Sequence, residues 1–366
     1  MGTIFFPGVA FAVTVVLIAG LRPLASRMGL VDMPNARKLH SGATPMVGGI
    51  AIYLGILIAV LAQSLIVPID PVLYRNYFSF FAGTLLMVIV GTIDDRRGLS
   101  PLARFTAQFI AILIMVYGAE NRLHDLGAIL PGGYVLQLGW LSLPFTVFAG
   151  IGVINAINMS DGLDGLSGNL ILVSLLGFGI ANNIWGGPDR MLVLNITSAA
   201  VIGFLVWNQR IFGRAKAWVF MGDAGSMMLG YTLAWGAIEI SQGAEGVSMP
   251  KFISPAATLW LVMMPLYDTV AISLRRMIAG KSPMHPDTEH LHHLLLRLGY
   301  TVGESITWIC FLAACGVAIG ICGTLLGLSE FVLGLLFLVG GVAYLWVMDR
   351  AWRQGSLFGR PFVANG

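Results

Sequence analysis

Charged residues are scarce in this sequence. Only 11% of its 366 residues are Asp, Glu, Lys or Arg, whereas 57% are hydrophobic, and the mean hydropathy is +0.83. Soluble domains carry about 25% charged residues, so the composition excludes an ordinary soluble protein and indicates one embedded in a lipid bilayer. The net charge of +3 is spread over segments that flank apolar runs, which gives no reason to expect nucleic-acid binding.

Cysteine is scarcer still, with three residues in the whole sequence. The sequence also lacks internal repeats and low-complexity tracts. Cys310, Cys315 and Cys322 fall in one apolar run, which excludes a disulfide framework and the ligand spacing of a structural zinc site. The first apolar run lacks a basic start and a small-residue cleavage site, so we expect it to be retained. We therefore expect one transmembrane domain over residues 1–350 and a short cytoplasmic tail at 351–366.

Long apolar runs set the expected fold class. A helix that spans a bilayer needs roughly 20 apolar residues, and the sequence predicts an all-α, polytopic membrane protein with about eleven such helices. They lie near residues 4–21, 46–67, 77–93, 105–118, 141–157, 168–185, 191–207, 225–240, 253–274, 305–327 and 330–348. With the N-terminus outside and the C-terminus cytoplasmic, 17 of the 21 lysines and arginines lie inside, as the positive-inside rule requires.

This topology places the unusual polar residues on one face. The cytoplasmic loops are then residues 22–45, 94–104, 158–167, 208–224 and 275–304. They carry nearly all the unusual polar motifs, and five of the six histidines. We therefore expect an active site on the cytoplasmic side that performs metal-assisted chemistry on a phosphorylated substrate.

Carboxylates are the first candidates for that site. Asp94 and Asp95 are adjacent and repel each other unless a cation lies nearby; Mg²⁺ binds through one or two carboxylates plus phosphate oxygens. Asn158, Asp161 and Asp164 form a second group, in which the two acids share a face if the segment is helical. The alternatives are solvated acids at a membrane boundary and helix capping.

Two further acids lie at expected helices. Asp223 sits where an apolar helix begins, and a helix N-terminus favours phosphate together with the cation that phosphate brings; N-capping is the alternative. In the segment of Asn158, Asp161 and Asp164, Gly162 and Gly165 leave the backbone open to a ligand. Phe220 is suited either to stacking on a base or to interfacial packing. Asp268 lies inside a predicted span, where we expect it to pair with another group.

Histidine is concentrated in a single segment. Four of the six histidines lie within residues 285–293, and with Arg275, Arg276 and Lys281 they suit the binding of phosphate oxygens. The alternatives are a zinc site, which lacks cysteine partners, and a solvated basic loop.

Taken in order, these motifs resemble a known family. They are GLVDMPNARKLH at 29–40, Asp94-Asp95, NAINMSDGLDG at 155–165, FMGDAGS at 220–226, and Ser282-Pro283 followed by HLHH at 290–293. From about residue 20 to 350 the chain resembles the polyprenyl-phosphate N-acetylhexosamine-1-phosphate transferases. Sibling phospho-N-acetylmuramoyl-pentapeptide transferases usually lack the Arg-Lys-x-His segment and have ten spans.

The resemblance implies a reaction and a location. N-acetylglucosamine-1-phosphate would pass from UDP-N-acetylglucosamine to undecaprenyl phosphate, giving undecaprenyl-diphosphate-N-acetylglucosamine and UMP. This is the first step of lipid-linked surface glycan synthesis, at the cytoplasmic face of the bacterial inner membrane. Relatives that use another UDP-N-acetylhexosamine keep the same motifs, so the donor sugar stays open. A homodimer is compatible with the family, although no residue requires it.

The resemblance also implies roles for individual residues. The cofactor would be Mg²⁺, with Mn²⁺ as a substitute, bound by Asp223 and Asp95, and one family proposal assigns an Asp as general base while another assigns an Asp as covalent nucleophile. The implied catalytic residues are Asp94, Asp95, Asp161 and Asp164. The implied substrate-binding residues are Arg37, Lys38, His40, Asn155, Asn158, Phe220, Arg275, Arg276, His290, His292 and His293.

Two other classes of protein compete with an enzyme. A transporter for a nucleotide sugar or lipid phosphate also needs buried charges, but it would hold them near the bilayer midplane, in broken helices. A membrane scaffold for glycan assembly would show no dependence on magnesium. The placement of the charged motifs at the ends of spans favours the enzyme.

Overall fold

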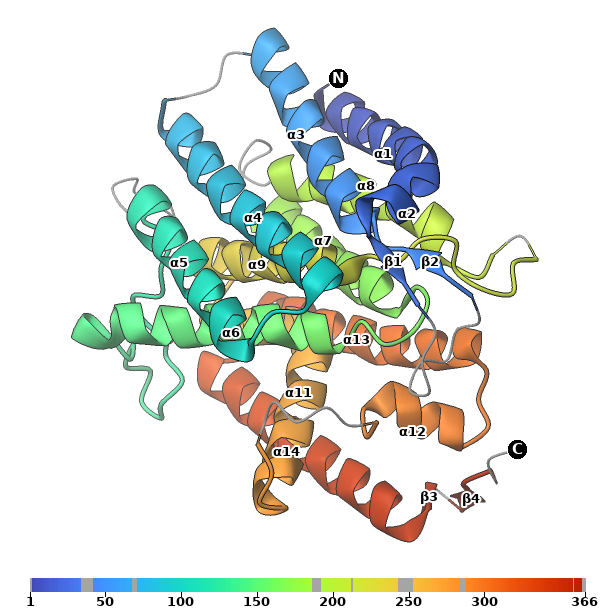
Figure 1. The fold of residues 1–366 in the computed structure, drawn as a ribbon. Helices are drawn as coiled ribbons and strands as arrows, with labels where there is room; N and C mark the ends of the chain where they lie inside the picture. Colours follow the sequence, from blue (N-terminus) through green and yellow to red (C-terminus); the bar gives the residue numbers. More distant parts are fainter. Residues whose placement is uncertain are drawn as a thin grey trace.

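The computed structural model describes residues 2–33, 42–67, 71–185, 192–211, 213–242, 253–282, 288–357 and 359–363. Within these ranges the chain is almost entirely α-helical, with two very short antiparallel strand pairs (Figure 1). The predicted all-α class is therefore confirmed. Arg37, Lys38 and His40 lie outside the described residues.

Fourteen helices and four short strands are described in order along the chain. The helices are α1 (Gly2–Leu21), α2 (Ala25–Met28), α3 (Gly48–Ile66), α4 (Pro71–Arg97), α5 (Pro101–Ala119), α6 (Ser142–Met159), α7 (Leu166–Trp185), α8 (Leu192–Asn208), α9 (Gly222–Gln242), α10 (Pro255–Leu261), α11 (Met263–Ile278), α12 (Leu291–Arg297), α13 (Val302–Leu325) and α14 (Glu330–Gln354). Strand β1 (Val31–Asp32) pairs with β2 (Thr44–Pro45), and β3 (Ser356–Leu357) pairs with β4 (Arg360–Pro361).

Eight of the described helices are long and apolar enough to cross a membrane, and α10 with α11 would make a ninth span that bends by 85°. Each of the eleven predicted spans overlaps a described helix or this bent pair. However, α8 is a shorter apolar helix, and α9 carries polar and acidic residues along its length. The structure thus supports a multi-pass membrane protein, while the count of eleven and the orientation of the termini stay predictions.

Helix α9 lies at the centre of the bundle. Sixteen of its 21 residues are buried, and it packs against α3, α4, α6, α7 and α10; Figure 1 shows it crossing behind α4. A helix buried on all sides is the expected central element of a helical domain. The many Gly, Ala and Ser residues of α9 allow neighbouring helices to approach its backbone closely.

The start of α9 is held by the start of α3. Gly48 and Gly49 donate backbone hydrogen bonds to the carbonyls of Phe220 (3.1 Å) and Met221 (3.0 Å), and Phe220 donates to Pro45 (2.8 Å). A Cβ atom on Gly49 would lie 2.2 Å from the backbone nitrogen of Gly225. The Phe-Met-Gly-Asp motif is therefore positioned by backbone contacts that require glycine at the crossing.

The Gly49→Ala variant should be less stable than the natural protein. Its methyl group would meet backbone, which cannot move aside as a side chain can, and overpacking of this kind costs about 1–3 kcal/mol. Gly152→Ala on α6 is the matched control, because no atom lies within 4 Å of its added Cβ. Thermal unfolding of both purified variants tests this, and equal midpoints would contradict it.

Candidate active site

A cavity of about 400 Å³ lies where the polar segments meet. The described residues that line it are Asp32, Met46, Asp95, Asn158, Asp161, Gly162, Leu163, Asp164, Asn208, Arg210, Phe220, Gly222, Asp223 and His293. Each of the five predicted polar segments contributes at least one of them. The structure therefore brings together segments that are separated by more than 250 residues of sequence.

Asp95 connects the end of α4 to the beginning of α9. Its carboxylate accepts hydrogen bonds from the backbone N–H groups of Asp223 (2.8 Å) and Ala224 (3.2 Å). The first N–H groups of a helix have no partner within the helix, so Asp95 satisfies two of them. The capping role considered for Asp223 is thus performed by Asp95, and the Asp223 side chain is left for other contacts.

The Asp223 carboxylate is oriented by an amide. Asn158, at the end of α6, donates from Nδ2 to Asp223 Oδ1 (2.6 Å) and to the hydroxyl of Ser226 (2.9 Å). Because an amide nitrogen donates two hydrogen bonds, Asn158 fixes the carboxylate relative to the first turn of α9. Its predicted place at the site agrees with this geometry.

Asp94 lies beside Asp223 but has its own partners. It accepts a hydrogen bond from the Leu99 backbone (2.6 Å) and lies 3.3 Å from the Arg104 guanidinium. The Asp94 and Asp223 carboxylates interact electrostatically, and Arg104 offsets part of their repulsion. Two acids brought this close favour a bound cation.

Asp161 and Asp164 lie in the turn between α6 and α7, not on a helix. A shared helical face was expected only if this stretch were helical, and that condition is not met, because α6 ends at Met159 and α7 begins at Leu166. Asp161 accepts a hydrogen bond from Ser167 (2.5 Å). Asp164 instead pairs with Arg210 (2.8 Å) and accepts from the Ala217 backbone (3.0 Å), so it ties this turn to the segment before α9.

The environment of Asp161 disfavours its charged form. Although the side chain borders the cavity and keeps some exposure there, burial against the surrounding protein raises the pKa of Asp161 to about 6. The hydrogen bond from Ser167 opposes this shift, and the Asp223 and Asp164 carboxylates add to it. A cation in the cavity would relieve this cost.

Gly162 is close to a histidine. A Cβ atom at this position would lie 2.3 Å from His292 Nε2. We expected the glycines of this turn to leave the backbone open to a ligand, but at Gly162 the space for a side chain is taken by the His292 ring. The glycine is required here by close packing of protein against protein.

The three histidines of the HLHH motif stand at different depths. His290 bonds through Nδ1 to Asp268 (2.7 Å), and both residues are buried, which confirms that Asp268 pairs with another group. His292 is also buried, and burial followed by the neighbouring His293 and His290 lowers its pKa to about 3, so it is neutral. Of the three, only His293 belongs to the described cavity lining.

Besides His290 and His292, three predicted substrate-binding residues do not line this cavity. Arg275 pairs with Glu289 (2.9 Å), Arg276 is buried away from the described lining, and Asn155 donates to Gln108 in α5 (2.8 Å). Among the described residues, Arg104 and Arg210 form ion pairs with two of the site acids, Asp94 and Asp164. The sequence interpretation counted these two arginines only for membrane orientation.

A signal for both missed arginines was present in the sequence. Arg104 and Arg210 belong to loops 94–104 and 208–224, which were already predicted to face the site. The structure also adds Asp32 and Asn208 to the cavity. Asn208 accepts from the Gly165 backbone (2.8 Å) and donates to the Val219 carbonyl (2.8 Å), so it joins two site segments.

The cavity has the chemistry of a cation site that a ligand completes. Its described lining contains five Asp side chains and one Arg, which leaves an excess of negative charge and oxygen ligands. No group of three or more His, Cys, Asp or Glu residues gathers as a metal cage in the described part of the chain. This fits Mg²⁺, which uses one or two carboxylates plus phosphate oxygens, and it disfavours the zinc alternative.

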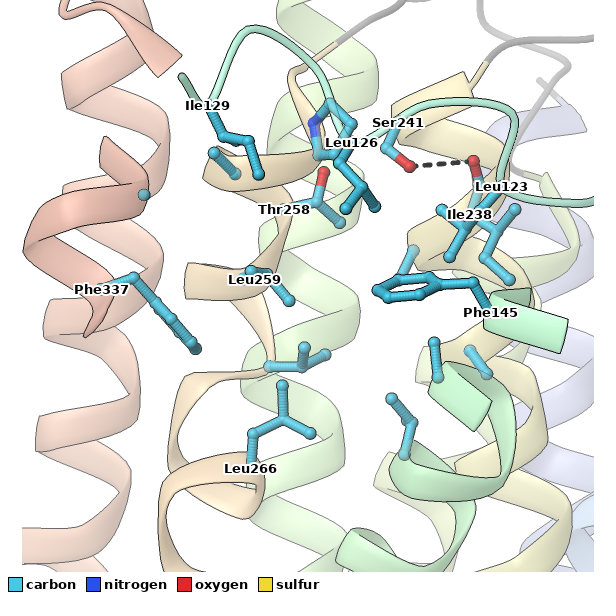
Figure 2. Close-up of a pocket in the computed structure, with 18 of the residues that line it drawn as sticks. Leu123, Leu126, Ile129, Phe145, Ile238, Ser241, Thr258, Leu259, Leu266 and Phe337 are labelled. Atoms are coloured by element: carbon cyan, nitrogen blue, oxygen red, sulfur yellow. Dashed lines mark hydrogen bonds between the residues drawn. The ribbon is translucent and has the colours of Figure 1, made fainter. Parts of the chain in front are cut away.

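A second cavity, of about 320 Å³, has a different character. It lies between α6, α9, α10, α11 and α14, and Figure 2 shows Phe145 and Phe337 on its sides with Leu126 and Ile129 at one end. Among the described residues that line it, the polar side chains are Ser241 and Thr258, and none is titratable at neutral pH. It cannot supply acid, base or metal chemistry, so the carboxylate cavity is the candidate active site.

Known proteins share the sequence of this chain over most of its length. Residues 77–241 match the family model described as Glycosyl transferase family 4. The undecaprenyl-phosphate alpha-N-acetylglucosaminyl 1-phosphate transferase of Escherichia coli (strain K12) is 36% identical over 94% of this chain and 90% of its own length. The proteins of the same name from Yersinia pestis (36%, covering 91% of this chain and 87% of theirs) and Haemophilus influenzae (37%, 91% and 90%) are similarly close.

Substitution of Asp95 should lower the stability of the protein, whereas substitution of Asp223 should not. Asp95→Ala leaves two N–H groups of α9 without an acceptor, which costs about 1–3 kcal/mol each when such groups are buried. Asp223→Asn keeps an oxygen for Asn158 and removes a charge that faces Asp94, so its stability should equal or exceed that of the natural protein. Thermal unfolding without added metal compares them; equal destabilisation of both would show that Asp95 is no more structural than Asp223.

Proposed function

Because this chain belongs to the polyprenyl-phosphate N-acetylhexosamine-1-phosphate transferase family, we propose that it transfers N-acetylglucosamine-1-phosphate from UDP-N-acetylglucosamine to undecaprenyl phosphate. The products are undecaprenyl-diphosphate-N-acetylglucosamine and UMP. The observation that carries the proposal is the convergence of five polar segments, with Asp223 at the start of α9, on one carboxylate-rich cavity. The names of relatives that align with nearly the whole chain support this donor and acceptor.

Asp223 is the proposed principal ligand of Mg²⁺. Asp95 was predicted as a second ligand, but its carboxylate already accepts two backbone hydrogen bonds, so its main contribution is to place Asp223. Asp161 borders the same cavity and is an available second oxygen ligand. When bound, the ion neutralises the negative charge of the diphosphate and helps to align the displacement.

The reaction exchanges one phosphorus–oxygen bond for another. An oxygen of the acceptor phosphate attacks the phosphorus that carries N-acetylglucosamine, and the bond from that phosphorus to the bridging oxygen breaks, so that UMP leaves with the electron pair. A phosphate monoester has a second pKa of about 6, so the acceptor is already largely dianionic at neutral pH. The protein therefore needs to position and neutralise charge more than to remove a proton.

The cavity lining offers a partner for each part of the donor. Phe220 borders the cavity and can stack on the uracil base, while Arg210 and His293 supply hydrogen-bond donors for phosphate oxygens. Asn158, Asp161 and Asp223 belong to the same lining. Arg210 is partly committed to Asp164, which leaves part of its guanidinium for a ligand.

We place the cavity on the cytoplasmic side of a bacterial inner membrane. The support is the asymmetry of basic residues, with 17 of 21 in the segments that share a face with the site motifs. UDP-sugars are made in the cytoplasm, so this orientation gives the donor direct access. The lipid-linked product would then enter surface glycan synthesis, such as that of O-antigen or common antigen.

The proposal predicts that purified protein releases UMP only when undecaprenyl phosphate and Mg²⁺ are both present. Asp223→Asn should abolish release while the protein stays folded, and Tyr134→Phe, at an exposed side chain, is the control. Release with a different UDP-N-acetylhexosamine would keep the chemistry and change the donor. No release with any donor would contradict the proposal and favour a transporter.

Asp94→Asn should lose activity through charge and position and not through loss of a base. The Asp94 carboxylate is held by Leu99 and Arg104, and the amide keeps the shape but removes the charge. We expect the same proportional loss from pH 6.5 to pH 9, because the acceptor phosphate is already ionised over most of this range. Measured rates across that range test the point; activity that recovers as pH rises would instead support a general base.

A further inference from the structure

Helix α14 takes no part in the carboxylate cavity, yet it contacts the elements that carry the histidines. Three of its 25 residues are buried, and none of them lines the cavity. Its second half packs against α11 and α12, and it is followed by the β3–β4 hairpin. This distribution raises the question of what the described residues from Glu330 onward contribute to a cavity that they do not line.

One end of α12 is held through a buried carboxylate. The Tyr344 hydroxyl, on α14, donates to Asp268 Oδ1 (2.8 Å), which also accepts from the Leu291 backbone (3.0 Å). Asp268 Oδ2 accepts from His290 Nδ1 (2.7 Å). A buried carboxylate must be fully hydrogen-bonded to be tolerated, so three donors from two chain segments, α14 and residues 290–291, determine its orientation, and the carboxylate determines that of His290.

The orientation of His290 extends to the cavity through ring contacts. The His290 and His292 rings are stacked, with centroids 5.5 Å apart and 13° between their planes, and the His292 and His293 rings are 4.2 Å apart. Gly162 confines His292 on its other side. A rotation of His290 would therefore displace His293, the histidine that borders the cavity.

The other end of α12 is held by the hairpin. The Val363 backbone donates to the Arg297 carbonyl (2.7 Å), and the Arg360 guanidinium lies 4.2 Å from the centre of the Tyr300 ring. Phe362 packs edge-on against Trp352 of α14, with ring centroids 5.5 Å apart. Figure 1 shows the hairpin beside α12.

Helix α12 needs such support because it is short. It has seven residues, and isolated helices shorter than about 12 residues are marginal in water. Its position therefore depends on contacts from other elements. The contacts at its first end come from Asp268 of α11, which Tyr344 of α14 holds, and those at its second end come from the hairpin that follows α14.

We propose that α14 and the β3–β4 hairpin hold α12 at both ends and so place His293 at the cavity, with Tyr344 as a positioning residue that acts through Asp268 and His290. The kinetic part of this inference rests on the proposed function, since it concerns the transferase rate. The contacts themselves do not depend on it. The C-terminal tail then belongs to the working structure of the site.

The first test is kinetic and uses Tyr344→Phe, which removes one hydroxyl and keeps the ring. We expect kcat to fall about ten-fold, the rate equivalent of one hydrogen bond to a charged group, with little change in the KM for the donor. Tyr134→Phe is the matched control at an exposed site. In a His290→Gln background Tyr344→Phe should cause no further loss, because the residues act in series. An unchanged kcat, or losses that multiply, would overturn the proposal.

The second test does not depend on activity. Hydrogen exchange of the backbone amides over residues 291–300 should be faster in Tyr344→Phe and in Phe362→Ala than in Tyr134→Phe, since each variant releases one end of α12. Unchanged exchange in both variants would overturn the proposal even if the natural protein is an active transferase. Faster exchange in a protein that releases no UMP would uphold the support of α12 and reject only the proposed function.

Discussion

Two hydrogen bonds from the first turn of α9 to the Asp95 carboxylate are the contact on which the rest of the site depends. They join the end of one long apolar helix to the start of the central one, and they satisfy N–H groups that would otherwise be left without partners inside the bundle. They also determine which contacts are left for the Asp223 side chain. With the capping role filled from α4, the Asp223 carboxylate faces the cavity, where Asn158 orients it.

Several acidic side chains lie close together in the site, and its arginines offset only part of their mutual repulsion. Arg104 and Arg210 each pair with one acid, Asp94 and Asp164, while the carboxyl groups of Asp223 and Asp161 line the cavity. Burial raises the pKa of Asp161 to about 6, which expresses the same cost. Such an arrangement is expensive in a protein alone and becomes favourable with a divalent cation and the phosphates that it binds.

The histidine segment shows how a short, polar helix is stabilised at the end of an apolar bundle. The buried leucines of α12 belong to one hydrophobic cluster together with Leu163, in the turn between α6 and α7, and Met348 of α14. Its polar face presents histidines at three depths, from the Asp268 pair to the cavity. Identical residue types in one tetrapeptide thus have different environments, and their chemistry follows from depth and neighbours and not from the motif.

The membrane class and the presence of a carboxylate site could be read from the sequence, because apolar runs and the asymmetry of basic residues act along the chain and need no knowledge of packing. Alternation of loops across the bilayer then placed the polar segments together, and the cavity contains residues from all five. Other parts of the prediction depended on contacts between distant segments. Arg104 and Arg210, in place of Arg275 and Arg276, reach the acids. Asp161 and Asp164 both lie in a turn between two helices and not on a helix. The choice of Asp95 as the cap of α9 and of His293 as the histidine that borders the cavity was decided by tertiary structure alone. The Asp95 cap depends on the positions of two helices that packing, and not sequence spacing, brings to hydrogen-bond distance.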